Sequence, residues 1–134
     1  MSDFAGRTVL LNLWATWCTP CLKEMPTLDA LQGELGGRDF TVLALSVDKG
    51  DKGVEKARAF LAKINAEHLG LYVDTSARAA SRFGAPGLPT TYLIDPEGQL
   101  VGRLTGEADW ASDEAKRFLQ AIIEAEQKPS SQPE

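Results

Sequence analysis

The sequence predicts an α/β domain with a central mixed sheet flanked by helices. Apolar runs typical of strands alternate with segments of helical periodicity, and two strand-like runs near the C-terminal end are joined by a turn signal. The composition, 43% hydrophobic and 25% charged over 134 residues, is that of one globular domain with a sizeable core. Strand–helix–strand connections favour parallel strands with right-handed crossovers, so we expect the first strands to be parallel and the last to be antiparallel.

The chain begins with a strand that leads into a helix. Residues 7–14 form an apolar run, which predicts a buried strand. Residues 19–35 carry Leu and Met side chains at spacings of three and four, and this helical pattern ends at Gly36-Gly37. Residues 40–47 are rich in apolar and β-branched side chains and predict a second strand.

The middle of the chain predicts a second helix, a short strand and a short helix. Residues 49–53 are polar and indicate a loop, whereas residues 54–66 carry apolar side chains on one helical face. Residues 71–73 are a short strand-like run, and residues 76–83 favour a short helix. These segments continue the alternation of strands and helices.

The last part of the chain predicts a hairpin, a helix and a tail. The strand-like runs 90–94 and 99–104 flank Asp95-Pro96-Glu97-Gly98, a strong turn signal that favours an antiparallel hairpin. Residues 111–125 predict the final helix. Residues 127–134 have almost no apolar side chains to bury, so we expect a disordered tail or linker after a single domain over residues 1–126.

Charge and hydropathy exclude several classes of function. A net charge of −5 without any basic run argues against nucleic acid as a partner. The longest apolar stretches fall well short of the roughly 20 residues that cross a bilayer. The start, Met1-Ser2-Asp3-Phe4, has no charged region followed by an apolar one, so we expect no signal peptide in it. We therefore expect either a cytosolic protein or a domain excised from a longer chain.

Both cysteines of the chain lie in Trp17-Cys18-Thr19-Pro20-Cys21, between the first strand and the first helix. A disulfide between them closes almost no loop, so it adds little to stability and instead offers a reversible two-electron switch. At the helix N-terminus the dipole and free N–H groups stabilise a thiolate, which makes Cys18 the nucleophile. Cys21, one turn later and facing inward, is suited to resolve the mixed disulfide. Pro20 has no N–H to lose in the first helical turn.

Two other readings of the cysteine pair are a structural thiol pair and part of a zinc site. A structural zinc ion requires four ligands, and the only histidine, His68, lies 47 positions beyond Cys21. Redox chemistry is therefore the stronger hypothesis. We expect His68 to be solvated, and Asp48 to belong with neighbouring acids and lysines to a solvated face.

Two segments carry a resemblance to the thioredoxin superfamily. The first runs from Asn12 to Cys21 and continues into Glu24-Met25-Pro26, and the second is Gly87-Leu88-Pro89-Thr90-Thr91-Tyr92-Leu93-Ile94-Asp95. Within that superfamily they are similar to the TlpA/ResA-like branch, over about residues 3–125. The resemblance implies a thioredoxin-like fold with a helix–strand insert, which residues 54–73 fit. It also implies an N-terminal β-hairpin that this sequence lacks.

The resemblance implies that Glu24 shuttles protons during thiol–disulfide exchange. A carboxylate half-buried beside two sulfurs could have a raised pKa. Taken from the sequence alone, Glu24 is more simply an acid that complements the helix dipole or is solvated. Thioredoxins proper carry a buried aspartate six residues before the first cysteine, and here that position is Asn12, which cannot titrate. Glu24 or water must then serve as the proton acceptor.

The resemblance also implies that Pro89 is cis and that Leu88 and Pro89 contact an extended substrate peptide, although an ordinary trans proline at a strand start is the commoner case. Trp17, together with Thr19 and Pro20, is expected at the rim of the site as a further substrate contact. Trp14 and Trp110 are expected to be structural.

These observations predict a thiol–disulfide oxidoreductase that reduces disulfides of partner proteins. The resemblance implies substrates such as apocytochrome c cysteines or copper-site cysteines, a membrane or soluble thiol as electron donor, and a periplasmic or other extracytoplasmic location with an anchor in the full-length protein. A cytoplasmic location stays open. We expect a monomer, no nucleic acid, no metal and no cofactor other than the redox-active disulfide Cys18–Cys21.

Two alternatives belong to other classes. A peroxiredoxin-like thiol peroxidase shares the broader fold, but its Pro-x-x-x-Thr-x-x-Cys pattern is missing before Cys18. A copper-binding module of the Sco type requires a CxxxC pair and a later histidine, and no histidine follows His68. Both are weaker than the oxidoreductase hypothesis.

Overall fold

Strand β1 (Thr8–Trp14) is the centre of a five-stranded sheet in this computed structural model, which describes residues 6–127. All seven residues of β1 are buried, as expected for a strand covered on both faces. The other elements, in chain order, are α1 (Thr19–Leu35), β2 (Phe40–Ser46), α2 (Gly50–Lys63), β3 (Tyr72–Val73), α3 (Ala79–Arg82), β4 (Thr90–Ile94), β5 (Leu100–Thr105) and α4 (Asp113–Gln127).

The sheet is mixed, with the strand order β3-β2-β1-β4-β5. Strands β1, β2 and β3 are parallel, whereas β4 is antiparallel to both β1 and β5. Thr8 pairs with Phe40 and Trp14 with Ser46, so the parallel register of β1 and β2 is uninterrupted. The predicted fold class, a mixed sheet with an antiparallel last strand, is confirmed.

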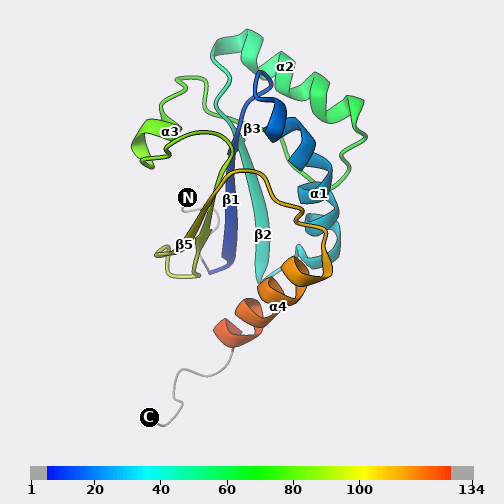
Figure 1. Cartoon of the computed structure of the whole chain (residues 1–134), viewed down its shortest axis with the longest axis vertical. Helices are drawn as coiled ribbons and strands as arrows, with labels where there is room; N and C mark the ends of the chain where they lie inside the picture. The colour runs from blue at the N-terminus through cyan, green and yellow to red at the C-terminus, as the bar shows by residue number, and fades with distance from the viewer. Residues whose placement is uncertain (1–5, 128–134) are drawn as a thin grey trace.

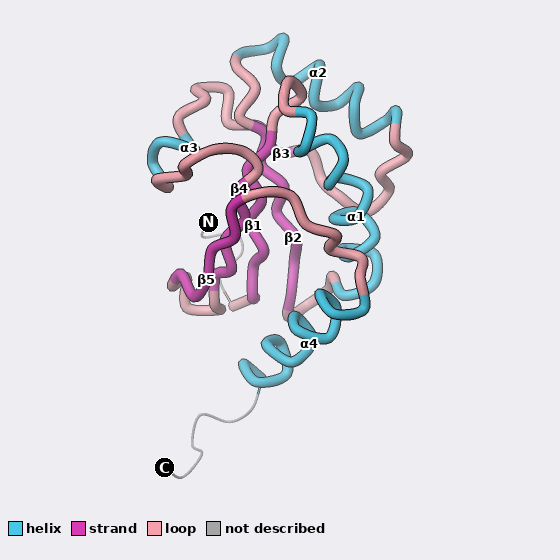
Figure 2. Tube along the Cα trace, viewed as in Figure 1, coloured by secondary structure: helices cyan, strands magenta, loops and turns pink. Residues whose placement is uncertain are grey.

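Helices cover the sheet from both sides. In Figure 1, α1 lies to the right of the strands and α3 to the left, while α2 runs across the upper end and α4 across the lower end. Figure 2 shows the long connection from β5 to α4 crossing in front of the sheet towards α1. Because of this connection, the start of α4 lies against α1, and the connection itself can contact side chains of α1.

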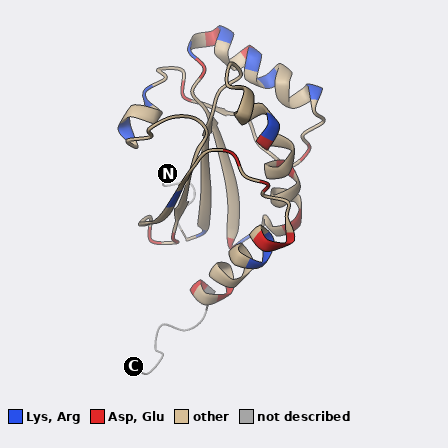
Figure 3. Ribbon diagram, in the orientation of Figure 1, with Lys and Arg blue, Asp and Glu red and all other residues tan. Residues whose placement is uncertain are grey.

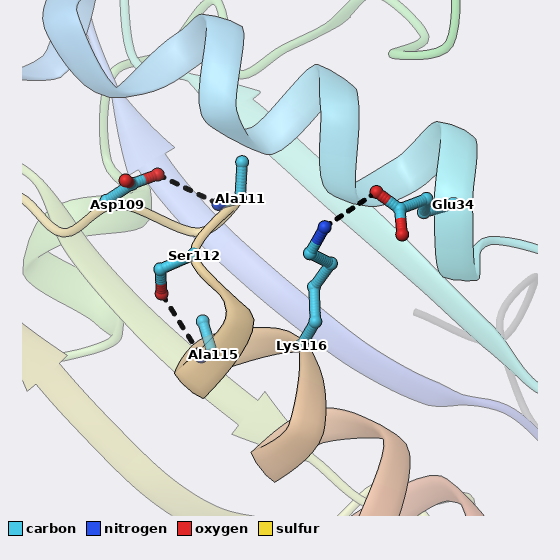
Figure 4. Close-up of polar contacts among 6 residues, drawn as sticks. All are labelled: Glu34, Asp109, Ala111, Ser112, Ala115 and Lys116. Carbon is cyan, nitrogen blue, oxygen red and sulfur yellow. Dashed lines mark hydrogen bonds and ion pairs between the residues drawn. The ribbon is translucent and has the colours of Figure 1, made fainter.

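Polar contacts fix the start of α4 (Figure 4). The Ser112 hydroxyl accepts the Ala115 N–H at 3.2 Å, which is a helix N-cap contact. The Lys116 ammonium lies 2.8 Å from the Glu34 carboxylate at the C-terminal end of α1, and this hydrogen bond raises the pKa of Lys116. The Glu34 side chain is more than half exposed to water, which screens the ion pair, so the pair orients the two helices more than it stabilises them.

The core lies between the sheet and its helices, and Figure 3 shows most charged residues along the helices and in the loops. Met25, Leu28 and Leu31 of α1 are fully buried at helical spacing and pack onto the sheet. Burying one such side chain contributes about 1.5–3 kcal/mol. This packing holds the helix that carries Cys21.

Several element boundaries differ from the sequence predictions. The prediction of a loop over residues 49–53 is wrong, because α2 begins at Gly50. The first turn of this helix is polar and includes Asp51, whose negative charge complements the helix dipole. The helix expected over residues 76–83 shrinks to α3, because the Asp74 carboxylate accepts the backbone N–H groups of Arg78 and Ala79 and turns the chain before the helix starts.

The tail predicted over residues 127–134 lies outside the described residues, apart from Gln127 at the end of α4. Over residues 6–127, no helix combines the length and the apolar character that crossing a membrane requires.

Candidate active site

The two cysteines form a disulfide at the N-terminal end of α1. Cys18 is the N-cap residue, with extended backbone angles (φ −107°, ψ 104°), and its Sγ accepts the Cys21 N–H at 3.3 Å. The two Cα atoms are 5.3 Å apart. Cys18 is 7% exposed and Cys21 is 0% exposed, so of the two cysteines only the one at the helix terminus has any exposed surface. After reduction, free N–H groups and the helix dipole would stabilise a thiolate at Cys18.

Glu24 is buried one helical turn after Cys21, on the same side of α1. Its Oε1 accepts a hydrogen bond from Asn12 Nδ2 at 2.8 Å. Its Oε2 accepts the Ala108 N–H at 3.0 Å and the Trp110 Nε1–H at 2.9 Å. The carboxylate therefore joins α1 to strand β1 and to the connection between β5 and α4.

The environment of Glu24 pushes its pKa in two directions. Burial raises the pKa, because removal from water disfavours the charged form, and the negative charge of Glu107 raises it further. The hydrogen bonds from Trp110, Asn12 and Ala108 lower it. Burial is the larger effect, so the pKa of Glu24 lies above its ordinary value. A carboxyl group of this kind can take and return a proton closer to neutral pH than an exposed glutamate.

The structure corrects the expectation that Glu24 is only half-buried, since 1% of the residue is exposed. It also assigns partners that sequence reasoning missed. Asn12 is the nearest donor to Glu24 and donates a second bond to Thr91 Oγ1 at 3.0 Å. Trp110 was expected to be structural, yet its indole N–H binds the carboxylate. No signal in the sequence links a residue 86 positions away to Glu24.

The Leu88–Pro89 peptide bond is cis, as the resemblance implied. The antiparallel register pairs Thr90 with Leu13, which places Pro89 at the end of the sheet where β1 runs into the cysteine loop. The Pro89 carbonyl accepts the Gly106 N–H at 2.8 Å. Pro89 is buried and Leu88 is half-buried, so of the two only Leu88 presents side-chain surface to a partner.

The remaining candidate contacts lie on the surface beside the disulfide. Trp17 is 70% exposed, and Thr19 and Pro20 are exposed as well. By contrast, Trp14 is buried and its ring lies 5.8 Å from that of Phe60. The structure thus separates an exposed rim around Cys18 from a closed interior around Cys21.

Asp48 does not belong to a solvated face, and that expectation is wrong. It is 3% exposed, while the neighbouring Asp51 and Glu55 are exposed on α2. Its carboxylate binds the Thr16 backbone and the hydroxyl groups of Thr16 and Ser46. The sequence pattern failed here because the parallel pairing of β1 and β2 brings the segments after both strands together.

Over residues 6–127, no three His, Cys, Asp or Glu side chains come together in a way that could hold a metal ion.

Comparison with known proteins places this site in a family. The AhpC/TSA family matches residues 1–103, which include the cysteines, Glu24 and Pro89. The chain belongs to this family.

Relatives narrow the assignment to the ResA-like branch. The chain is 30% identical over 122 residues to the thiol-disulfide oxidoreductase ResA of Bacillus thuringiensis subsp. konkukian, covering 91% of this chain and 67% of that protein. It is 32% identical over 126 residues to ResA of Geobacillus thermodenitrificans, with the same coverage. The predicted membership of the thioredoxin superfamily, with a TlpA/ResA-like pattern, is confirmed.

Solved structures that are similar to this chain confirm the fold. A protein from Chlorobium tepidum assigned as the thiol:disulfide interchange protein DsbE superposes with a TM-score of 0.77 at 28% identity, covering 91% of this chain and 84% of that one. The exposed lipoprotein thioredoxin Etrx1 of Streptococcus pneumoniae gives 0.71 at 28% identity, with coverages of 92% and 88%. The predicted enzyme class, a thiol-disulfide oxidoreductase with a thioredoxin-like fold, is confirmed.

Proposed function

We propose that this protein reduces disulfides in partner proteins, using Cys18 as nucleophile, Cys21 as resolving cysteine and Glu24 as proton shuttle. The observation that carries the proposal is the arrangement on α1. An N-cap sulfur is followed one turn later by a buried sulfur, and after another turn by a buried carboxyl group. These groups supply the attacking sulfur, the resolving sulfur and the proton acceptor of a two-step exchange.

The first step is the attack of the Cys18 thiolate on one sulfur of the partner's disulfide. A bond forms between Cys18 Sγ and that sulfur, and the partner's S–S bond breaks. Its second sulfur leaves with the electron pair and takes a proton from solvent. Trp17 and Leu88 offer apolar surface beside the attacking sulfur, and the backbone around Pro89 offers polar groups to an extended peptide.

The second step is resolution by Cys21. The Cys21 thiol gives its proton to Glu24, and the resulting thiolate attacks Cys18 Sγ. The Cys18–Cys21 bond forms, and the partner's remaining sulfur leaves as a thiolate that takes the proton held by Glu24. Overall, the partner's disulfide gains two electrons and two protons, and the enzyme's two thiols become a disulfide. An external thiol donor then reduces the enzyme's disulfide for the next cycle.

The partners and location follow the relatives. We propose thiol- or disulfide-containing proteins as partners, with the cysteines of apocytochrome c or of a respiratory copper site as the favoured class, and a monomeric enzyme in an extracytoplasmic compartment. The naming of Etrx1 as an exposed lipoprotein thioredoxin supports this location. A peroxidase or a copper-binding module has no comparable support from the geometry around Cys18.

The reduction potential tests the direction of the reaction. The Pro20 position before the second cysteine favours a potential near that of thioredoxin, about −270 mV, over that of DsbA, about −120 mV. Equilibration with dithiothreitol and glutathione buffers, read out by thiol alkylation and mass, gives the value. A potential at the DsbA end would overturn the reductive role.

The partner and the two cysteine roles are tested by trapping. Cys21→Ser should accumulate mixed disulfides through Cys18, because the resolving thiol is missing, and Cys18→Ser should accumulate none. The measurement is non-reducing electrophoresis and mass identification of the adducts formed in an extract of the source cells. Equal trapping by both variants would contradict the assigned roles.

A further inference from the structure

Asp48 and Thr16 face each other because the register of β1 and β2 continues past both strands. Each residue of β1 pairs with the residue 32 positions later, from Thr8 and Phe40 to Trp14 and Ser46. The Val47 N–H donates to the Trp14 carbonyl at 2.8 Å, which extends the ladder beyond the strands. Thr16 and Asp48 keep the same separation of 32.

The Asp48 carboxylate holds Thr16 at two atoms. Oδ2 accepts the Thr16 backbone N–H at 3.0 Å, and Oδ1 accepts the Thr16 hydroxyl at 2.6 Å. The carboxylate is itself fixed, because Oδ2 also accepts the Ser46 hydroxyl at 2.5 Å and the Asp48 N–H donates to that hydroxyl at 3.0 Å. We call these contacts among Ser46, Asp48 and Thr16 the Asp48 clasp.

The clasp binds the turn that ends at Cys18, the proposed nucleophile. The Cys18 N–H donates to the Ala15 carbonyl at 3.1 Å, so residues 15–18 form a turn with Thr16 and Trp17 at its centre. The chain itself joins this turn to β1, and the hydrogen bonds between Thr16 and Asp48 join it to the residues just after β2.

Helix α2 supports the clasp from behind. A Cβ atom at Gly53 would lie 2.6 Å from the backbone carbon of Asp48 and 2.8 Å from its Cβ, so only glycine lets the first turn of α2 approach this closely. The backbone of Asp48 is thus packed between α2 and the cysteine loop. An aspartate on flexible backbone could not restrain the turn in this way.

We propose that Asp48 is a positioning residue for the nucleophile: through Thr16 it keeps the reduced Cys18 loop close to the geometry of the disulfide. In the oxidised enzyme the Cys18–Cys21 bond restrains Cys18 covalently, so the clasp adds little. In the reduced enzyme that bond is gone, and the clasp limits the freedom of the turn. The effective concentration of Cys21 at Cys18 is then higher than it would be for a free loop.

This role rests on the proposed exchange chemistry and predicts which equilibrium moves. Loss of the clasp should favour the reduced enzyme, because its loop gains freedom while the oxidised loop stays bonded. Asp48→Asn should lower the equilibrium constant for oxidation by glutathione about tenfold, which corresponds to about 30 mV towards less reducing potentials. The mixed disulfide of Cys18 with glutathione should persist longer, because its resolution is slower.

Matched variants separate positioning from stability and from charge. Asp29→Asn is the control for stability, since the Asp29 carboxylate also binds loop N–H groups, those of His68 and Leu69 at 2.8 and 3.0 Å. Asp29 lies on α1, eight residues beyond Cys21, and has none of its partners in the cysteine loop. Thr16→Val removes the hydroxyl contact and keeps the charge of Asp48, whereas Thr16→Ser keeps both.

The test measures the glutathione equilibrium constant of the full chain from pH 5 to 9, together with unfolding in urea for every variant. We expect the equilibrium constant to be lower for Asp48→Asn at every pH and to fall less for Thr16→Val. For Thr16→Ser and Asp29→Asn we expect values within twofold of wild type. Equal values for Asp48→Asn and Asp29→Asn would overturn the proposal. A decrease in the equilibrium constant that Asp48→Asn shows only at high pH would also overturn the proposal, because it would indicate an effect of charge on the thiolate.

If Asp48→Asn does not fold, the pair Thr16→Val and Thr16→Ser decides the question. The equilibrium constant needs only the two cysteines and glutathione, so a failure to reduce partner proteins would refute the proposed function while leaving this test intact.

Discussion

Two buried carboxylates, Glu24 and Asp48, flank the cysteine motif and differ in what they hold. Glu24 accepts three N–H groups that come from two separate parts of the chain, strand β1 and the connection between β5 and α4. Asp48 accepts one N–H and two hydroxyl groups, all within two residues of the ends of neighbouring strands. Glu24 lies on the helix after Cys21, and Asp48 binds the turn before Cys18.

The difference indicates that burial alone does not make a carboxylate a catalyst. Glu24 stands one helical turn from the resolving thiol, and its pKa is raised by burial, so it is suited to move a proton. Asp48 is engaged with backbone and hydroxyl donors of the cysteine loop, so it is suited to hold geometry. The experiments below test whether the two roles are separable.

Glu24→Gln should have the largest effect on exchange chemistry, because it removes the proton acceptor and nearly preserves the shape. We expect the resolution step near neutral pH to slow by about tenfold to a hundredfold, at the low end of acid–base contributions. Rapid-mixing measurements of mixed-disulfide decay from pH 5 to 9 give the rate. Glu34→Gln, an exposed position on the same helix, is the control. An unchanged pH–rate profile would return Glu24 to a structural role.

The stability of the oxidised protein should also depend on pH through Glu24. Its folded pKa is raised above the ordinary value of 4.5, so above pH 4.5 the folded state holds more protons at this site than the unfolded state. The free energy of unfolding therefore falls as pH rises from 4.5 through the raised pKa, and this contribution is constant above it. Urea titrations of wild type and Glu24→Gln should diverge over that window. Parallel curves would contradict the raised pKa.

Trp110→Phe should have the smallest effect on the rate of resolution, and it tests how the indole hydrogen bond acts on Glu24. The indole hydrogen bond lowers the pKa of Glu24, so its loss should raise that pKa and move the pH–rate profile of resolution to higher pH. We expect a rate change below about tenfold at neutral pH, because the hydrogen bonds from Asn12 and Ala108 to the carboxylate remain.

Trp14→Phe is the matched control for that substitution. Trp14 is also buried, and its Nε1 has no hydrogen-bond partner among the side chains of residues 6–127. Phenylalanine there should alter packing and leave the pH–rate profile in place. An equal displacement of the profile by both variants would show that packing, and not the indole N–H, acts on Glu24.

The fold was predictable because its strands and helices have strong local signals. The bounds of α1 and β4 agree with the sequence prediction, since helical spacing and flanking Gly and Pro residues mark them. The start of α2 was missed because a polar first turn resembles a loop. The short helix α3 was overestimated because backbone capping by Asp74 is a tertiary detail that propensity does not report.

The candidate site was predictable only where a motif marks it. Cys18, Cys21 and Glu24 lie within one helical segment, so spacing and resemblance could identify them. Trp110 contacts Glu24, and Asp48 contacts Thr16, across large sequence separations, and nothing local distinguishes the two from ordinary core or surface residues. Their contributions depend on how the β5–α4 connection returns to α1 and on how β2 pairs with β1.

Paired residues of β1 and β2 are always 32 positions apart, and this constant separation fixes which residues of the two following loops lie opposite each other. One residue inserted between Ser46 and Asp48 would leave the sheet paired but carry the carboxylate past Thr16. Conversely, equal insertions after both strands would preserve the alignment while lengthening the reach of the nucleophile. The spacing of the two strand ends thus sets a length constraint on any redesign of the cysteine loop.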